Sequence, residues 1–272
     1  MSTNDLFSLK GRVAIVTGSL GLLGREHIDA LAAAGANVVV VDLDETKCRE
    51  AAGGLQSKYG STMLGVGADI TKRSAVERLR TLSCDAFGRI DVLVNNAAIN
   101  DLLEESRPDR TRFEQYSVDD WKAMFDVNVM GTFLCCQILG SVMADRRRGS
   151  IINIASTYGL VAPDQRIYRR PDNVQHFYKS PAYPATKGAV LAFTKYLASY
   201  WASANVRVNA LSPGGVQDNQ EDYFVKNYSA RTPLGRMGQP SDYRGALIFL
   251  ASDASAYMTG ANVVVDGGWV IW

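Results

Sequence analysis

A tyrosine and a lysine lie one helical turn apart in the stretch "AYPATKG", residues 182–188. Tyr183 and Lys187 are four positions apart, so on a helix their side chains share one face. A free tyrosine has a pKa of about 10 and is a poor base at neutral pH, whereas a nearby ammonium favours the phenolate. The pair could manage a proton at a reacting oxygen, or it could be an ordinary helix surface in a chain with 12 tyrosines.

A glycine-rich turn follows the first apolar run, in "TGSLGLLGRE" at residues 17–26. Gly18, Gly21 and Gly24 stand between an expected strand and an expected helix. Glycine permits a tight turn and close approach of the backbone to a pyrophosphate, and the helix start offers unpaired N–H groups. Glycines also serve plain turns, so the strand and helix context carries the prediction of a phosphate-binding turn.

The second expected strand ends in Asp42, 18 residues after Gly24. A carboxylate at that place can accept hydrogen bonds from both hydroxyls of an adenosine ribose and repels a 2′-phosphate. The next residue, Leu43, supplies no cation to offset this repulsion. We therefore expect NAD rather than NADP as the cofactor. Asp44, before "ETKCRE", is the better candidate for a helix cap.

The elements that must position these residues are short runs of Val and Ile without polar alternation. Such runs are typical of strands that are buried on both faces of a parallel sheet. They lie at residues 12–17, 37–42, 91–96, 150–156, 206–212 and 262–267, with a weaker run at 61–69. Helical patterns alternate with them, which predicts a single-domain Rossmann-type α/β fold over residues 1–272, a doubly wound parallel sheet with helices on both faces.

Three segments interrupt this alternation, at residues 98–119, 159–181 and 213–240. Each follows an expected strand and should emerge at the carboxyl edge of the sheet, where open α/β folds bind ligands. Loops of this length in a compact domain are more often functional than idle. We expect them to form the substrate side of the site.

The composition narrows the class of partner. The chain has 272 residues, 47% of them hydrophobic, and a formal net charge of +1, which gives no sign of a nucleic-acid partner. The start has no signal-peptide run and no stretch approaches the length of a membrane span, so a cytoplasmic protein is expected. The four cysteines form no CxxC pair, and with only His27 and His176 as histidines no metal site is predicted.

Further motifs occur in a characteristic order along the chain. They are "NNAA" at 95–98, Asn128 in "DVNVMGT", Ser156 in "INIAST", "SPGGV" at 212–216, and a closing "VVVDGGW". With the glycine turn and the Tyr–Lys pair, they resemble the short-chain dehydrogenase/reductase family over essentially the whole chain. The phrases "STYGLVAP" and "LSPGGVQDNQEDYFVKNY" are also similar to members associated with bacterial surface-sugar and flagellin modification, of the legionaminic-acid type.

The resemblance implies a catalytic set. Tyr183 would be the acid/base, Ser156 would orient the substrate oxygen, Lys187 would tune the tyrosine and hold the nicotinamide ribose, and Asn128 would support a proton-relay water. The cofactor would supply the hydride chemistry, while the protein would supply position and proton management.

The resemblance also implies a set of cofactor contacts. The residues expected to bind NAD are Gly18, Gly21, Leu22, Leu23, Gly24, Asp42, Asp69, Ile70, Asn95, Ala97, Tyr183, Lys187, Pro213, Gly214 and Val216. Leu22 departs from the family, because it stands where the middle glycine of TGxxxGxG is usual. For Asn95, hydrogen bonding to a neighbouring strand is a structural role that could coexist with a cofactor contact.

The gap of 27 residues between Ser156 and Tyr183 is longer than is usual in the family. Its basic loop must return so that Tyr183 meets Ser156, and Pro184 suits only a first helical turn, so the helix should begin close to Tyr183. The loop is either a solvated surface or an anion site for a phosphate or carboxylate of the substrate. The substrate-binding candidates are Thr157, Arg166, Arg169, Arg170 and His176.

The leading hypothesis is an NAD-dependent oxidoreductase that transfers a hydride between nicotinamide and a secondary alcohol or ketone, with a carbohydrate-like or nucleotide-sugar substrate. A carrier-linked 3-oxoacyl reductase is an alternative, and a non-catalytic nucleotide-sensing protein is a weaker one. Family members are usually tetramers, so a homotetramer is expected, with a dimer possible. Trp269 and Trp272 should cover a subunit contact or a pocket rim.

Overall fold

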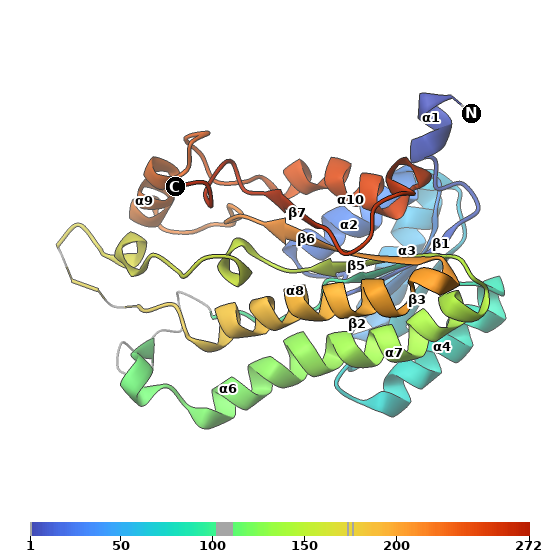
Figure 1. Cartoon of the computed structure of the whole chain (residues 1–272), viewed down its shortest axis with the longest axis horizontal. Coiled ribbons are helices and arrows are strands. Elements are labelled where there is room, and N and C mark those ends of the chain that lie inside the picture. The colour runs from blue at the N-terminus through green and yellow to red at the C-terminus, as the bar shows by residue number, and fades with distance from the viewer. Residues whose placement is uncertain (1, 102–110, 173, 176) are drawn as a thin grey trace.

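The chain folds around a seven-stranded parallel sheet of order β3-β2-β1-β4-β5-β6-β7 (Figure 1). The computed structural model describes residues 2–101, 111–172, 174–175 and 177–272. The strands are β1 (Val13–Thr17), β2 (Asn37–Asp42), β3 (Met63–Gly67), β4 (Val92–Asn95), β5 (Gly149–Ile154), β6 (Val206–Pro213) and β7 (Asn262–Val265). The expected strands are confirmed, and their ends differ by at most two residues.

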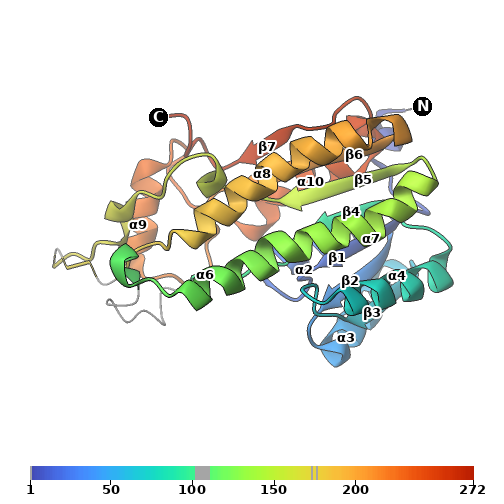
Figure 2. The same cartoon turned by 60° about the horizontal axis from the view of Figure 1, so that its bottom comes forward.

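Helices cover both faces of the sheet, as the absence of polar alternation in the strands predicts (Figure 2). One face carries α2 (Leu22–Ala33), α3 (Glu45–Tyr59) and α10 (Arg244–Ala251). The other carries α4 (Arg73–Phe87), α7 (Thr132–Asp145) and α8 (Ala182–Tyr200). Other helices within the described residues are α1 (Thr3–Phe7), α6 (Val118–Phe125) and α9 (Asp222–Arg231). The fold is therefore the predicted Rossmann-type α/β sheet.

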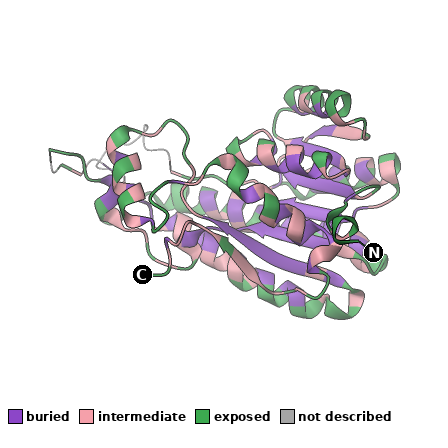
Figure 3. Cartoon of the chain, turned by 90° about the horizontal axis from the view of Figure 1, so that it is seen from above, coloured by how far each residue is buried: buried purple, intermediate pink, exposed green. Residues whose placement is uncertain are grey.

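The strands β1, β2, β4, β5 and β6 are among the most deeply buried parts of the protein, whereas β7 at the edge is partly exposed (Figure 3). All five residues of β1 are buried, because helices cover the strand on both sides. Val16 of β1 lies opposite Val40 of β2 and Val94 of β4. The order of strands reverses beside β1, since β2 and β4 lie on its two sides, and this is the point at which a ligand crevice forms in open α/β sheets.

The helix α6 continues through a π-helical segment, Asp126–Gly131, into α7. The combined helix, Val118–Asp145, is long and apolar enough by length and composition to cross a membrane, so the expectation that no stretch approaches that length was wrong. Leu134, Leu139 and Met143 are buried in the core against the sheet, and 56% of the apolar window is buried inside the protein. The apolar composition of this helix thus has a packing role.

The described parts of the three irregular segments lie at the carboxyl edge of the sheet, at the left of Figure 1. Residues 213–240 contain the helix α9, and residues 159–181 contain the short 3₁₀ turn Gln165–Tyr168. Part of the first segment, residues 102–110, lies outside the described residues. The helix α8 begins at Ala182, next to Tyr183, so the position predicted from Pro184 is confirmed.

Candidate functional site

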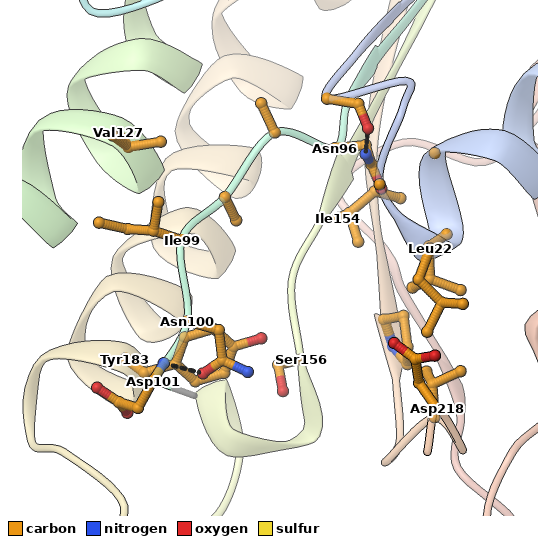
Figure 4. Close-up of a pocket in the computed structure, with 18 of the residues that line it drawn as sticks. Leu22, Asn96, Ile99, Asn100, Asp101, Val127, Ile154, Ser156, Tyr183 and Asp218 are labelled. Carbon is orange, nitrogen blue, oxygen red and sulfur yellow. Dashed lines mark hydrogen bonds between the residues drawn. The ribbon is translucent and has the colours of Figure 1, made fainter. Parts of the chain in front are cut away.

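A cleft of about 1470 Å³ runs along the carboxyl edge of the sheet. It extends from the glycine turn and Asp42 at one end to Ser156, Tyr183 and the loop before α8 at the other. Figure 4 shows Tyr183 facing Ser156 on one side of the cleft, with Leu22 on the opposite side. The cleft therefore joins the expected nucleotide end to the expected chemical end.

The glycine turn is built for close backbone approach. Gly18 has a φ of +64°, and a Cβ there would lie 2.7 Å from the Cα of Ala97. A Cβ on Gly24 would overlap the carbonyl oxygen of Gly18. Gly21 is the N-cap of α2 with an extended backbone, and it meets no such obstacle. Two of the three glycines are thus sterically required.

Leu22 is the first residue of α2 and lines the cleft, as does Leu23. The first helical hydrogen bond is donated by Arg25 to the Gly21 carbonyl, so the N–H groups of residues 22–24 precede the helical ladder. The start of the helix therefore stays open toward the cleft, although Leu22 stands where the middle glycine is usual. Such a helix end favours a negative group.

Asp42 lies at the end of β2 and lines the cleft. Its Oδ2 accepts a hydrogen bond of 2.9 Å from the N–H of Leu20, and its Oδ1 accepts one of 2.8 Å from Leu43. These two contacts fix the carboxylate beside the glycine turn. Two cationic side chains, Arg25 and Lys47, also line this end of the cleft.

The next part of the wall is formed by the ends of β3 and β4. Asp69 and Ile70 line the cleft, and Asp69 Oδ1 accepts hydrogen bonds from the N–H and hydroxyl of Thr71. These contacts hold the pKa of Asp69 below its usual value. Ala97 also lines the cleft, and its N–H donates to Thr17 Oγ1.

Asn95 does not line the cleft, contrary to the expected cofactor contact. Its amide nitrogen donates to Asn153 Oδ1 on β5 at 2.8 Å and to the sulfur of Cys136, so it joins two strands inside the core. The following Asn96 lines the cleft instead and donates to the carbonyl oxygens of Thr17 and Gly18. Asn96 thus ties the end of β4 to the glycine turn.

Tyr183 and Ser156 face one another at the chemical end of the cleft (Figure 4). Burial raises the pKa of Tyr183 to about 12, and a hydrogen bond with the Ser156 side chain opposes this rise. The Ser156 hydroxyl also accepts from the N–H of Tyr158, which fixes it at the start of the turn after β5. A substrate oxygen between the two hydroxyls would meet both.

Lys187 lies one turn further along α8 and is buried. Its ammonium donates to the carbonyl oxygen of Ile154 at 2.7 Å and lies 5.6 Å from the centre of the Tyr183 ring. Burial lowers the pKa of Lys187 to about 8. The one-turn spacing in the sequence therefore becomes a contact between a cation and the tyrosine.

Asn128 lies in the π-helical segment and does not line the cleft. Its Oδ1 accepts from the N–H of Ile99 at 2.8 Å, and its Nδ2 donates to the Ile99 carbonyl oxygen and to Thr186 Oγ1. Asn128 therefore clamps the segment after β4 to α8. The structure gives it a positioning contact.

The end of β6 and the loop after it form another part of the cleft wall. Pro213, Gly214 and Val216 line the cleft, and Gly214 donates a hydrogen bond to the Val265 carbonyl oxygen. Thr157 also lines the cleft and is buried. These four expected contact residues therefore lie on the cleft wall.

The three arginines of the basic loop do not line the cleft, contrary to the expected anion site. Arg166 is bound to Asp164 and Arg170 to Glu221, and both guanidinium groups point to carboxylates near the surface. Arg169 is exposed. The remaining candidate, His176, lies outside the described residues.

An aromatic wall, absent from the sequence-based expectations, faces the chemical end of the cleft. Its members are Tyr158, Tyr168, Phe177, Tyr223, Phe224 and Tyr228. Trp269 is buried behind this wall and stacks on Tyr228, with ring centres 4.0 Å apart, whereas Trp272 is exposed. The two tryptophans therefore differ. Trp269 supports the cleft wall of its own chain, and for Trp272 the subunit contact stays a prediction.

Lys179, Asn100 and Asp101 also line the cleft beside Tyr183 (Figure 4 labels the last two). None of the three belongs to a motif of the sequence. Lys179 lies in the segment at residues 159–181. Its partners come from the segment after β4, 79 positions away for Asn100, so only the folded chain brings them together.

The features of the nucleotide end fit a dinucleotide. The crevice beside β1 has glycines that a side chain could not replace, an open helix start and a carboxylate at the end of the second strand. A pyrophosphate would suit the first two, and a ribose the third. The residues present therefore match a nicotinamide dinucleotide.

Comparison with known proteins agrees with this geometry. The family model described as "Enoyl-(Acyl carrier protein) reductase" matches residues 22–270. D-threitol dehydrogenase of Mycolicibacterium smegmatis is 33% identical over 100% of this chain and 97% of that protein. The 3-oxoacyl-[acyl-carrier-protein] reductase of Synechocystis is 34% identical over 97% of this chain and 99% of that protein.

Among solved structures, a gluconate 5-dehydrogenase from Burkholderia cenocepacia in complex with NADP and tartrate has a TM-score of 0.87. It is 32% identical, and the match covers 100% of both chains. Three observations indicate the same family: the matches over the whole length, the order of the motifs, and the arrangement of Ser156, Tyr183 and Lys187. The chain therefore belongs to the short-chain dehydrogenase/reductase family and is an oxidoreductase.

Proposed function

We propose that this protein oxidises a secondary alcohol of a polyol or other carbohydrate-like molecule, with NAD as hydride acceptor, and catalyses the reverse reduction. The observation that carries the proposal is that Ser156, Tyr183 and Lys187 meet at one end of a cleft whose other end is the glycine turn. Bound nicotinamide would supply hydride acceptance.

The residues of the chain manage the proton. In the oxidative direction the Ser156 hydroxyl binds the substrate oxygen, and the Tyr183 phenolate takes the hydroxyl proton as the hydride leaves the carbon. The Lys187 ammonium stabilises that phenolate, because an opposite charge nearby favours the ionised form. Asn128 holds the Ile99 segment and α8 in register around the site.

The preference for NAD rests on Asp42. Its carboxylate is fixed beside the glycine turn by the N–H of Leu20, at the place where an adenosine ribose would lie. A 2′-phosphate would meet this negative charge, although Arg25 and Lys47 stand on the same wall. We expect kcat/KM with NAD to exceed kcat/KM with NADP. Asp42→Ala should lower the ratio of these two values by about 10-fold or more, because the repulsion between the carboxylate and the 2′-phosphate is removed.

The carbohydrate-like substrate is supported by two observations. The relatives with known activities include dehydrogenases of a polyol and of a sugar acid. The chemical end of the cleft combines an aromatic wall with the polar groups of Asn100, Asp101 and Lys179. Apolar walls with a few placed polar groups are the usual form of a small-molecule site, and they suit a molecule with both C–H faces and hydroxyls.

A carrier-linked 3-oxoacyl reductase is the second candidate, because one relative carries that name. A basic rim would suit an acidic carrier, but Arg166 and Arg170 are already bound to carboxylates of this chain. Asp42 disfavours NADPH, which reductive biosynthesis commonly uses. We therefore place the polyol activity first.

The test is a screen of NAD reduction over polyols, sugars, hydroxy acids and nucleotide sugars, with wild-type protein and Tyr183→Phe. Loss of the proton acceptor should lower turnover by about 10²- to 10⁴-fold, while NAD still binds. NAD binding is measured separately by fluorescence titration. The proposal fails if no substrate class gives turnover that depends on Tyr183, or if a carrier-linked 3-oxoacyl substrate with NADPH is the preferred pair.

A further inference from the structure

A second buried lysine lies beside the catalytic tyrosine. The side chain of Lys179 is 5% exposed, and its ammonium forms an ion pair of 3.0 Å with Asp101 Oδ2 and a hydrogen bond with Asn100 Oδ1. A buried ammonium is costly unless it is paired and hydrogen-bonded. Here the paired ammonium faces the cleft, so its position is compatible with binding a ligand.

The backbone around this ion pair is held on both sides. The Gln165 side chain accepts from the N–H of Lys179 at 2.9 Å and donates to its carbonyl oxygen at 3.0 Å. The N–H of Ser180 donates to Asp101 Oδ2, the same oxygen that meets the ammonium. The two charges are therefore fixed before any ligand arrives, which lowers the cost of ordering them on binding.

The ion pair belongs to the chemical end of the cleft. The Lys179 ammonium lies 4.4 Å from the centre of the Tyr183 ring, closer than the 5.6 Å of Lys187. Figure 4 shows Asn100 and Asp101 grouped with Tyr183, across from Ser156. A substrate oxygen held between Tyr183 and Ser156 would thus have the Lys179–Asp101 pair as its neighbour.

The two groups retain hydrogen-bonding capacity. An ammonium has three N–H donors, and within the described residues Lys179 uses two of them, on Asn100 and Asp101. Asp101 Oδ1 accepts from no side chain or N–H of the described residues, whereas Oδ2 accepts from Lys179 and Ser180. Among the described residues, the pair therefore leaves one ammonium donor and one carboxylate oxygen unused, and a hydroxyl can accept from the first and donate to the second.

We propose that Lys179 and Asp101 bind a hydroxyl on the carbon next to the reacting carbon, and so select vicinal diols over simple secondary alcohols. The inference rests on the proposed alcohol oxidation and specifies the substrate class of that site. A net neutral donor–acceptor pair suits an uncharged hydroxyl better than a carboxylate, since Asp101 would repel an anion. A site built to bond a hydroxyl discriminates strongly against a molecule without it, because its buried polar groups are left unpaired.

The test uses a matched pair of substrates, 2,3-butanediol and 2-butanol, which differ in the neighbouring hydroxyl. Wild-type protein should favour the diol. Lys179→Met should lower kcat/KM for the diol by about 10- to 100-fold more than for 2-butanol, mainly through a higher KM. Asp101→Asn should give a smaller loss with the same selectivity.

Lys195→Met is the matched control, because Lys195 is an exposed lysine of α8 away from the cleft. Urea unfolding of each variant separates loss of fold from loss of specificity. Equal loss on both substrates, or no loss on the diol, overturns the inference while the proposed function stands. Absence of Tyr183-dependent turnover on both substrates and on the wider panel overturns the proposed function, and the inference with it.

Discussion

Two lysines flank the ring of Tyr183, and their surroundings differ. Lys187 donates to a backbone carbonyl and carries a pKa lowered by burial to about 8, whereas Lys179 is bound to Asp101. A cation without a carboxylate partner acts on the tyrosine with its full charge, while a paired cation acts through its free donor. We therefore propose that Lys187 stabilises the Tyr183 phenolate and that Lys179 selects the substrate.

The first prediction concerns Lys187→Met. Oxidation needs the Tyr183 phenolate, so kcat/KM for the alcohol rises as pH rises through the effective pKa of the tyrosine. Removing the ammonium removes a charge that favours the phenolate, so that pKa increases and the rising limb moves to higher pH by about 1 to 3 units. The measurement is the pH profile of alcohol oxidation, with Lys195→Met as control. An unchanged profile, or a shift to lower pH, would contradict the assignment.

The residues that form local patterns could be read from the sequence, and those that meet only in the fold could not. Asp42, Ser156 and the Tyr183–Lys187 pair each stand at a strand end or one helical turn apart, and all four lie on the cleft wall. Lys179 meets partners from another segment, so no spacing in the sequence marks it.

The pair Asn95 and Asn96 illustrates a second limit. Successive residues at the end of a strand point to opposite sides, so one asparagine joins β5 and the other faces the glycine turn. The sequence "NNAA" contains both and does not say which is which. The expected anion site at the arginines is absent from the cleft wall for a related reason. The basic composition of the loop does not reveal that Arg166 and Arg170 bind carboxylates near the surface.

At the scale of elements, the strand–turn–helix unit of β1 and α2 positions the nucleotide end. Gly18 requires a positive φ and close contact with Ala97, and Gly24 lies against the same turn. The apolar runs predicted the strands because burial on both faces leaves no polar alternation. The helix α9 was not expected within residues 213–240, since its polar sequence lacks a strong apolar period.

The second prediction compares two glycine substitutions. Gly18→Ala should lower the free energy of unfolding by about 1 to 3 kcal/mol, because it adds backbone strain and a clash with Ala97. It should also weaken NAD binding, since the turn must move. Gly53→Ala, in the middle of α3 with open space around its Cα, should raise the free energy of unfolding by up to about 1 kcal/mol.

Urea unfolding and fluorescence titration with NAD measure the two effects. Equal stability of wild type and Gly18→Ala would refute the steric requirement at that turn. If a folded Gly18→Ala protein binds NAD as tightly as the wild type, the proposed contact between the glycine turn and NAD is contradicted.

At the scale of the whole molecule, the outer side of α8 carries an apolar surface. Tyr196 and Tyr200 are 62% and 64% exposed and stack on one another, and Val264 is partly exposed on the edge strand β7. Exposed aromatic rings grouped on one helix are typical of an interface. We propose that α8, which carries Tyr183 on its inner side, joins subunits through this outer side.

The third prediction is the assembly itself. Light scattering should give a mass of about four times the 29.6 kDa of one chain. The double variant Tyr196→Glu and Tyr200→Glu should give a smaller assembly, because buried carboxylates without partners oppose association. Glu substitution at the exposed Tyr257, which is not part of α8, is the control. A monomeric wild type, or a double variant with unchanged mass, would contradict the proposed interface.

The central claim is that hydride passes between a substrate carbinol carbon and nicotinamide under control of Tyr183. The most direct measurement supplies a polyol deuterated at its carbinol carbons with NAD and determines the isotope in the NADH formed by mass spectrometry. We predict one deuterium in each NADH with wild-type protein, and about 10²- to 10⁴-fold slower formation with Tyr183→Phe. NADH without deuterium, or equal rates for the two proteins, would contradict the account.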